Sequence, residues 1–163
     1  MEPALLLVGF VVLIVGYLWL QTRGRRALDR KVFNRAGHRE GVAAVKSKLV
    51  FEVPGSSAAQ VVSSVVASLG YPTTATTMAG TMIVSEQSED QVSFAYANRF
   101  SRSWVSTLSA TDVGDGARGE YAVASWHTSD GAPVAWKEME IIAGRVGRVL
   151  EGVGATVTVT APE

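Results

Sequence analysis

The chain has no cysteine and only two histidines among its 163 residues. Without thiols it can form neither a disulfide nor a thiolate metal site. The scarcity of histidine removes the usual general base and metal ligand from most of the sequence. We therefore expect no metal and no other cofactor.

Charge is absent from Ala4 to Leu20, which read ALLLVGFVVLIVGYLWL. A helix of this length covers roughly 26 Å, close to the hydrocarbon core of about 30 Å. Tyr17 and Trp19 stand near one end, where amphipathic rings favour the headgroup boundary. We predict a transmembrane anchor over residues 1–21. Its membrane-anchoring side chains are Leu5, Leu6, Leu7, Phe10, Leu13, Ile14, Tyr17 and Trp19.

Basic residues are absent before this run and frequent after it. The basic residues predicted to lie at the membrane surface are Arg23, Arg25, Arg26, Arg30 and Lys31. Lys and Arg in short flanks are retained in the cytoplasm. The pattern thus predicts a single-pass protein of the cell membrane, with its N-terminus outside and its C-terminal domain cytoplasmic. A cleaved signal peptide is the alternative, but the basic n-region and small-residue cleavage site it requires are missing.

The formal net charge of zero conceals an asymmetry along the chain. Residues 21–48 contain nine Lys or Arg against two acids, whereas residues 49–163 contain six against twelve. A basic segment beside a bilayer favours anionic lipid, and an acidic domain is repelled by nucleic acid. We expect the lipid bilayer as a partner and no nucleic acid. The predicted segments are the anchor, a basic connector (22–47) and one compact domain (48–163).

Period-two alternation and turn residues predict most of the domain's elements. Ser57 and Gln60 form a candidate capping box that begins a short helix, and Gly70 is suited to end it. Strands are expected at 48–53, 81–86, 91–97, 104–111 and 117–128, and in the terminal ATVTVTA. Short turns between successive strands favour antiparallel pairing. The fold class is therefore α+β, with an antiparallel sheet.

A long amphipathic helix is predicted from about residue 134 to 153 and should pack on the same sheet face as the short helix. Its apolar stripe consists of Met139, Ile142, Val146, Val149 and Val153. Gly144 and Gly147 each cost such a helix about 1 kcal/mol in propensity. They either permit close approach of a strand or a ligand, or are simply tolerated.

The segments FEVPGSSAAQVVSSVV and AWKEMEIIAGRVGRVLEGV carry a similarity over most of residues 48–153. In this spacing the chain resembles the START-like helix-grip superfamily, which includes the polyketide cyclase-like proteins. That family usually has two helices after the first strand and about six later strands, more than we predict here. The resemblance implies a pocket between the sheet and the C-terminal helix that takes an apolar ligand. Its candidate lining is Phe94, Tyr96, Trp104, Tyr121 and His127.

The sequence offers few candidates for catalysis. His127 could serve as a general base, but no orienting acid or nucleophile is identifiable beside it. Asp112, Asp115 and Asp130 are better explained by turn formation than by a calcium loop, because further ligands at regular spacing are missing. No catalytic residue is assigned.

Two functional hypotheses follow. The first is a membrane-anchored domain, without enzymatic activity, that binds a partner protein or an apolar small molecule at the inner membrane face. The second is a helix-grip enzyme, cyclase-like or hydrolase-like, with its pocket between sheet and long helix. A cavity that holds His127 beside a carboxylate would favour the enzyme.

Overall fold

The computed structural model describes residues 38–129 and 131–160. All of them except His38 belong to one compact unit, which begins at Arg39. The predicted anchor and the basic residues from Arg23 to Lys31 lie outside these ranges. Within the described residues, no helix combines the length and apolar character needed to span a bilayer.

Six antiparallel strands form the main sheet in the order β2-β3-β4-β5-β1-β8. The strands are β1 (Lys48–Pro54), β2 (Thr81–Gln87), β3 (Gln91–Ala97), β4 (Arg102–Val113), β5 (Gly116–Trp126) and β8 (Thr156–Thr160). A short hairpin of β6 (Thr128–Ser129) and β7 (Ala132–Pro133) follows β5. The predicted antiparallel sheet is thus confirmed. The first strand, β1, lies between β5 and the last strand.

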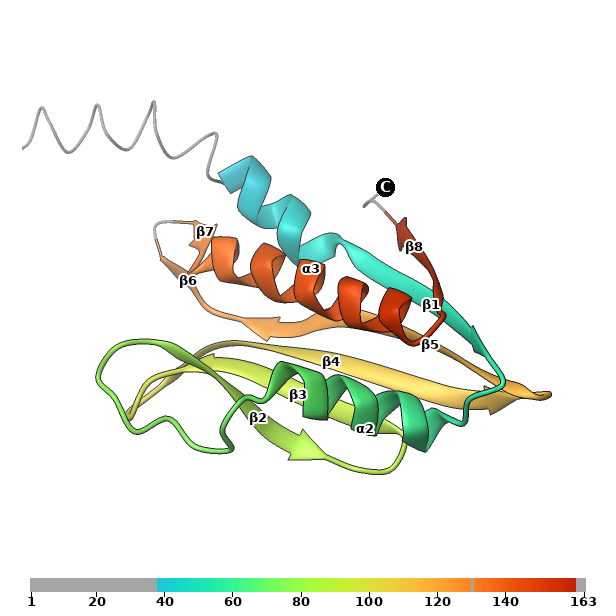
Figure 1. The fold of residues 1–163 in the computed structure, drawn as a ribbon. Helices are drawn as coiled ribbons and strands as arrows, with labels where there is room; N and C mark the ends of the chain where they lie inside the picture. The colour runs from blue at the N-terminus through green and yellow to red at the C-terminus, as the bar shows by residue number, and fades with distance from the viewer. Residues whose placement is uncertain (1–37, 130, 161–163) are drawn as a thin grey trace, which may run out of the picture. The chain divides into compact units, whose positions relative to one another are not determined.

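Two helices, α2 (Ala58–Leu69) and α3 (Trp136–Gly152), cover the same face of this sheet (Figure 1). α2 contacts β3, β4 and β5, α3 contacts β1 and β8, and the two helices contact each other. The predicted capping box is present, because the Ser57 side chain accepts from the Gln60 amide and Gln60 reaches back. Gly70 ends α2 at φ 59°. The α+β class is confirmed.

The main core lies between the two helices and the sheet. α3 buries Met139, Ile142, Val146 and Leu150. Val149 and Val153, which we assigned to the apolar stripe, are only partly buried. Leu150 takes the core position because steps of three, four and four residues keep Met139, Ile142, Val146 and Leu150 on one helical face.

The compact unit also includes part of the predicted connector. Residues 38–46 are helical, and Val45 is buried in the main core. Gly41 is buried, and a Cβ atom there would lie 2.8 Å from Cδ of Pro133. Because of this packing, the compact unit begins at Arg39, whereas the predicted domain began at Lys48. The short apolar run of residues 42–45, with only two valines, was too weak a sequence signal to predict it.

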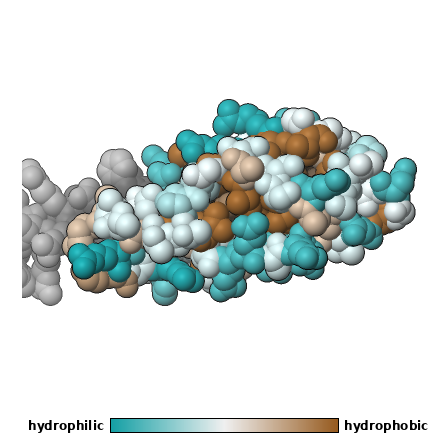
Figure 2. Space-filling model, turned by 60° about the horizontal axis from the view of Figure 1, so that its bottom comes forward, coloured by the Kyte–Doolittle hydropathy of each residue, from teal (hydrophilic) through white to brown (hydrophobic). Residues whose placement is uncertain are grey.

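Apolar residues also reach the surface and the other side of the sheet. Ile83, Ala95 and Ala97 form a small second cluster, against which Ala75 and Val105 pack. Figure 2 shows a face on which hydrophobic residues gather in the middle and hydrophilic residues surround them. Exposed apolar surface is common in soluble domains, so a functional site must be argued from a defined cavity.

Candidate functional site

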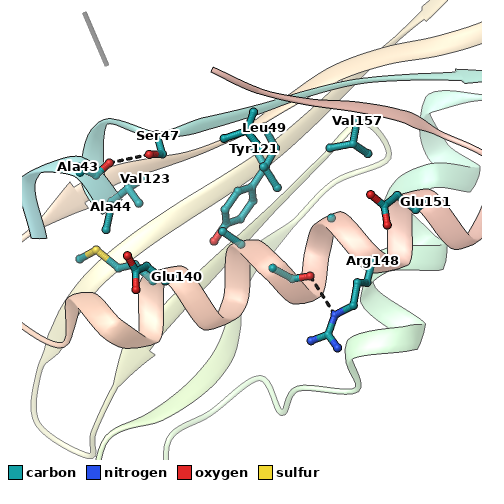
Figure 3. A pocket seen from close by; sticks show the side chains of 15 residues that line it. Ala43, Ala44, Ser47, Leu49, Tyr121, Val123, Glu140, Arg148, Glu151 and Val157 are labelled. Carbon is teal, nitrogen blue, oxygen red and sulfur yellow. Dashed lines mark hydrogen bonds between the residues drawn. The ribbon is translucent and has the colours of Figure 1, made fainter. Parts of the chain in front are cut away.

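An apolar groove of about 470 Å³ lies beside α3. Residues 43–47, β1 and β8 form its other side, and β5 contributes its base (Figure 3). This volume falls within the range of about 300–1,000 Å³ that is usual for small-molecule sites. The apolar side chains that line it are Ala43, Ala44, Leu49, Tyr121, Val123, Met139, Ala143, Val157 and Val159.

Two glycines of α3, Gly144 and Gly147, line the groove. A Cβ atom at Gly144 would meet nothing within 4 Å, and one at Gly147 would meet only Cδ1 of Leu49 at 3.8 Å. Neither glycine has a positive φ. Close packing of a strand therefore does not require them, and neither does the backbone conformation. Their effect is to leave space open on the groove side of the helix.

Tyr121 supplies part of the base of the groove. Figure 3 shows its ring between Leu49 and α3. The side chain is 2% exposed, and its hydroxyl donates to Oγ of Ser106 at 2.9 Å. Burial raises the pKa of Tyr121 above its usual range, and the hydrogen bond to Ser106 opposes that rise only in part. The phenol is therefore neutral at physiological pH and presents an apolar ring to the groove.

Charged side chains line the groove from exposed positions on α3. These residues are Glu140, Arg148 and Glu151. Nε of Arg148 donates to the carbonyl oxygen of Gly144 at 3.2 Å, so the guanidinium lies along its own helix. The groove thus combines an apolar interior with a charged rim, an arrangement that favours an apolar ligand over a charged one.

The other four predicted pocket residues do not line this groove. Phe94 and Trp104 are buried in the main core, and half-buried Tyr96 stacks on Trp104 with ring centroids 6.0 Å apart. The indole N–H of Trp104 finds no partner in the part of the chain that the structure describes. His127 is exposed just after β5, where its amide donates to the carbonyl of Ser103. Of the five predicted pocket residues, Tyr121 is therefore the one that lines the groove.

Of the carboxylates considered as metal ligands, Asp112 has a structural role, and Asp130 lies outside the described residues. Oδ1 of Asp112 accepts from the amide of Ala58 at 2.6 Å and so stabilises the start of α2. Within residues 38–129 and 131–160, no cluster of three or more His, Cys, Asp or Glu is arranged to hold a metal ion.

Sequence reasoning missed the residues that bring the groove together. Ala43, Ala44 and Ser47 come from the predicted connector, and Val157 and Val159 come from the last strand. A usable signal was present in α3, where Ala143, Gly144 and Gly147 place three small residues on one face of the helix.

No family model matches this chain, and no curated protein or solved structure matches it either. The resemblance to the helix-grip superfamily stays a prediction. Function must therefore be argued from the groove itself.

Proposed function

We propose that this protein is a single-pass membrane protein whose cytoplasmic α+β domain binds an apolar small molecule at the inner membrane face. The groove beside α3 is the binding site. The anchor is expected from the uncharged run of residues 4–20 and the basic residues that follow it. A domain held at the bilayer surface has direct access to apolar compounds that partition into lipid.

The observation that carries this proposal is the open space at Gly144 and Gly147. A glycine inside a helix costs about 1 kcal/mol relative to alanine. In this helix, alanine at position 144 would meet no neighbouring atom within 4 Å, so packing does not exclude it. The two glycines widen a groove whose apolar walls are alanine, valine, leucine, methionine and the ring of Tyr121. Such a lining gains free energy by removing a ligand's apolar surface from water.

The enzyme hypothesis depended on His127 inside the pocket. His127 is exposed and does not line the groove. The carboxylates that do line it, those of Glu140 and Glu151, are on exposed residues. We therefore favour binding over catalysis as the use of the groove.

Photolabelling tests this proposal on the full chain in membrane vesicles. A diazirine-bearing fatty alcohol, which has no charge, should label peptides that contain residues 139–151 and 157–159. Gly147→Leu places a bulky side chain in the groove and should reduce that labelling at least fivefold. Gly152→Leu is the matched control, because Gly152 is exposed at the end of α3 and does not line the groove. Labelling of the anchor alone, unaffected by Gly147→Leu, would refute the proposed site.

The membrane topology is tested separately. A reporter that works only in the cytoplasm should be active when it is fused to the C-terminus. Alkaline carbonate should fail to extract the protein from membranes. Activity of a reporter that requires export would reverse the proposed orientation. That result would leave the groove itself intact.

A further inference from the structure

The two edge strands of the main sheet differ in how they are protected. The β2 edge has a bulge between Val84 and Glu86, and the amide of Val84 donates to the carbonyl of Pro72 at 2.8 Å. Bulges, charged residues and covering loops are the usual means of preventing an edge from pairing with another chain. The β2 edge uses all three.

Within the residues that the structure describes, the β8 edge has none of these protections. Its residues, Thr156–Thr160, include no charge and no proline, and their register with β1 runs without a bulge. Among the described strands only β1 pairs with it, so its other side is an open edge. Val159 is 66% exposed although its register partner Leu49 is buried. The strand alternates two residue types with high β propensity.

The sequence of this strand, TVTVT, reads the same in both directions. We propose that two copies of the chain pair antiparallel through β8, with a two-fold axis at Thr158. In this register Thr156 lies opposite Thr160 of the second copy, and Val157 lies opposite Val159 of the second copy. A two-fold interface uses the same patch on both partners and must be complementary to itself. A palindromic strand meets this condition at every position.

The register with β1 determines which sides of the paired strands meet. Val157 and Val159 pair with Phe51 and Leu49, so both valines point to the face that carries the helices. Thr158 pairs with Val50 and points to the opposite face. The dimer therefore forms valine–valine pairs on one face and threonine–threonine pairs on the other. Cross-strand pairs of this kind are what stabilises one strand against the next in a sheet.

The pairing also joins the two grooves. An antiparallel pair has its two-fold axis perpendicular to the sheet, so both helix layers lie on the same face of a twelve-stranded sheet. Because Val157 and Val159 line the groove in each copy, the two grooves become neighbours across the joined strands. The exposed Val159 side chain is then covered by Val157 of the second copy.

A second copy suits this edge better than an unrelated strand for two reasons. The edge is complementary to itself at each of its positions. The pairing is also short, and two chains tethered in one membrane would meet at a high effective concentration that offsets a weak contact. The self-pairing itself does not depend on what the groove binds.

Cysteine cross-linking of the full chain in membranes tests the register. The chain has no cysteine, so each introduced thiol is unique. Thr158→Cys should form a disulfide dimer with itself, because the two sulfurs face each other directly across the axis. Thr156→Cys and Thr160→Cys should cross-link when co-expressed. Each alone should not, since two equivalent positions two residues from the axis are about 14 Å apart. Gln87→Cys, exposed on β2, is the control at the other edge.

A charge at the axis tests the association without cross-linking. Thr158→Lys places two ammonium groups opposite each other and should shift the mass of the purified protein in mild detergent from dimer to monomer. Thr158→Ser keeps the pairing and should leave the dimer mass unchanged. The proposal is overturned if Thr158→Cys cross-links no more than Gln87→Cys, or if the Thr158→Lys and Thr158→Ser proteins have the same mass. Cross-linking to a different protein alone would also overturn it.

Discussion

The two helices lie side by side on one sheet face but are stabilised by different means. α2 has the Ser57–Gln60 capping box and the Asp112 carboxylate at its start, and Gly70 in the left-handed conformation at its end. The N-cap residue of α3 is Ala135, which has φ 55° and makes no side-chain cap hydrogen bond. α3 also contains two internal glycines, yet it buries four large apolar side chains. Local signals thus define the ends of α2, whereas packing holds α3 in place.

The largest effect should come from breaking the packing of α3. Ile142 is 1% exposed, and Ile142→Asp replaces an apolar contact with a buried carboxylate. We expect a loss of about 4 kcal/mol or more in the free energy of unfolding. Ile141→Asp is the matched control, because Ile141 is 47% exposed on the same helix and should cost under about 1 kcal/mol. Urea unfolding of the full chain in detergent, followed by tryptophan fluorescence, measures both. Similar midpoints for the two variants would show that α3 is not held by this face.

Alkaline pH should weaken the α3 side of the molecule, where Tyr121 lies beneath the helix; α2 itself contains no ionisable side chain. The pKa of Tyr121 is raised in the folded state by burial. Protonated Tyr121 makes its full contribution to the free energy of unfolding below about pH 10, the pKa of tyrosine in the unfolded chain. That contribution is lost progressively as the pH rises above this value. Above about pH 10 the free energy of unfolding should fall by up to about 1.4 kcal/mol per pH unit more than in Tyr121→Phe. Denaturation series from pH 8 to 11 compare the two proteins, and equal slopes would contradict the burial of the phenol.

Removing a cap should destabilise α2 by a smaller amount. Ser57→Ala leaves the Gln60 amide without its side-chain acceptor, and we expect a loss of about 1 kcal/mol. Ser63→Ala, at an exposed position within the same helix, should be neutral or slightly stabilising because alanine has the higher helix propensity. Thermal unfolding by circular dichroism distinguishes the variants. A Ser57→Ala protein as stable as Ser63→Ala would mean that α2, like α3, depends on packing alone.

The smallest change expected is a gain at the start of α3. Ala135 is the one residue other than glycine with positive φ among the described residues. Glycine adopts this conformation without steric cost, but it loses more conformational entropy on folding than alanine does. The net effect of Ala135→Gly should be a gain of about 0.5 kcal/mol in the free energy of unfolding. The control is Val134→Gly, which should give no such gain because Val134 is half-buried and does not have a positive φ. A lower melting temperature for Ala135→Gly would show that the strain is offset by contacts of the Ala135 side chain.

The same contrast explains how much of the structure could be predicted from the sequence. Both ends of α2 were predicted, because Ser57, Gln60 and Gly70 act through neighbours in the chain. The strands from Thr81 to Trp126 were also predicted, since alternation and turn residues are local. Most of the lining of the groove was not predicted, because it depends on residues 43–47, α3 and β8 meeting in space. Tyr121 was predicted to line a pocket because of the resemblance to the helix-grip superfamily. The other residues of the groove come from elements whose positions become clear only from the order of the strands in the sheet.

The position of β1 has a consequence for synthesis of the protein. β1 is made first, yet both of its partners, β5 and β8, come much later, and Lys48 is paired with Ala122 on one side and Thr160 on the other. Contacts so distant in sequence slow folding. On the ribosome, the segment KLVFEV therefore has no partner until β5 has emerged, and its second edge stays open until β8 follows. During that interval it is an exposed apolar strand that chaperones would recognise. All residues up to Thr160 must be synthesised before the six-stranded sheet can be completed.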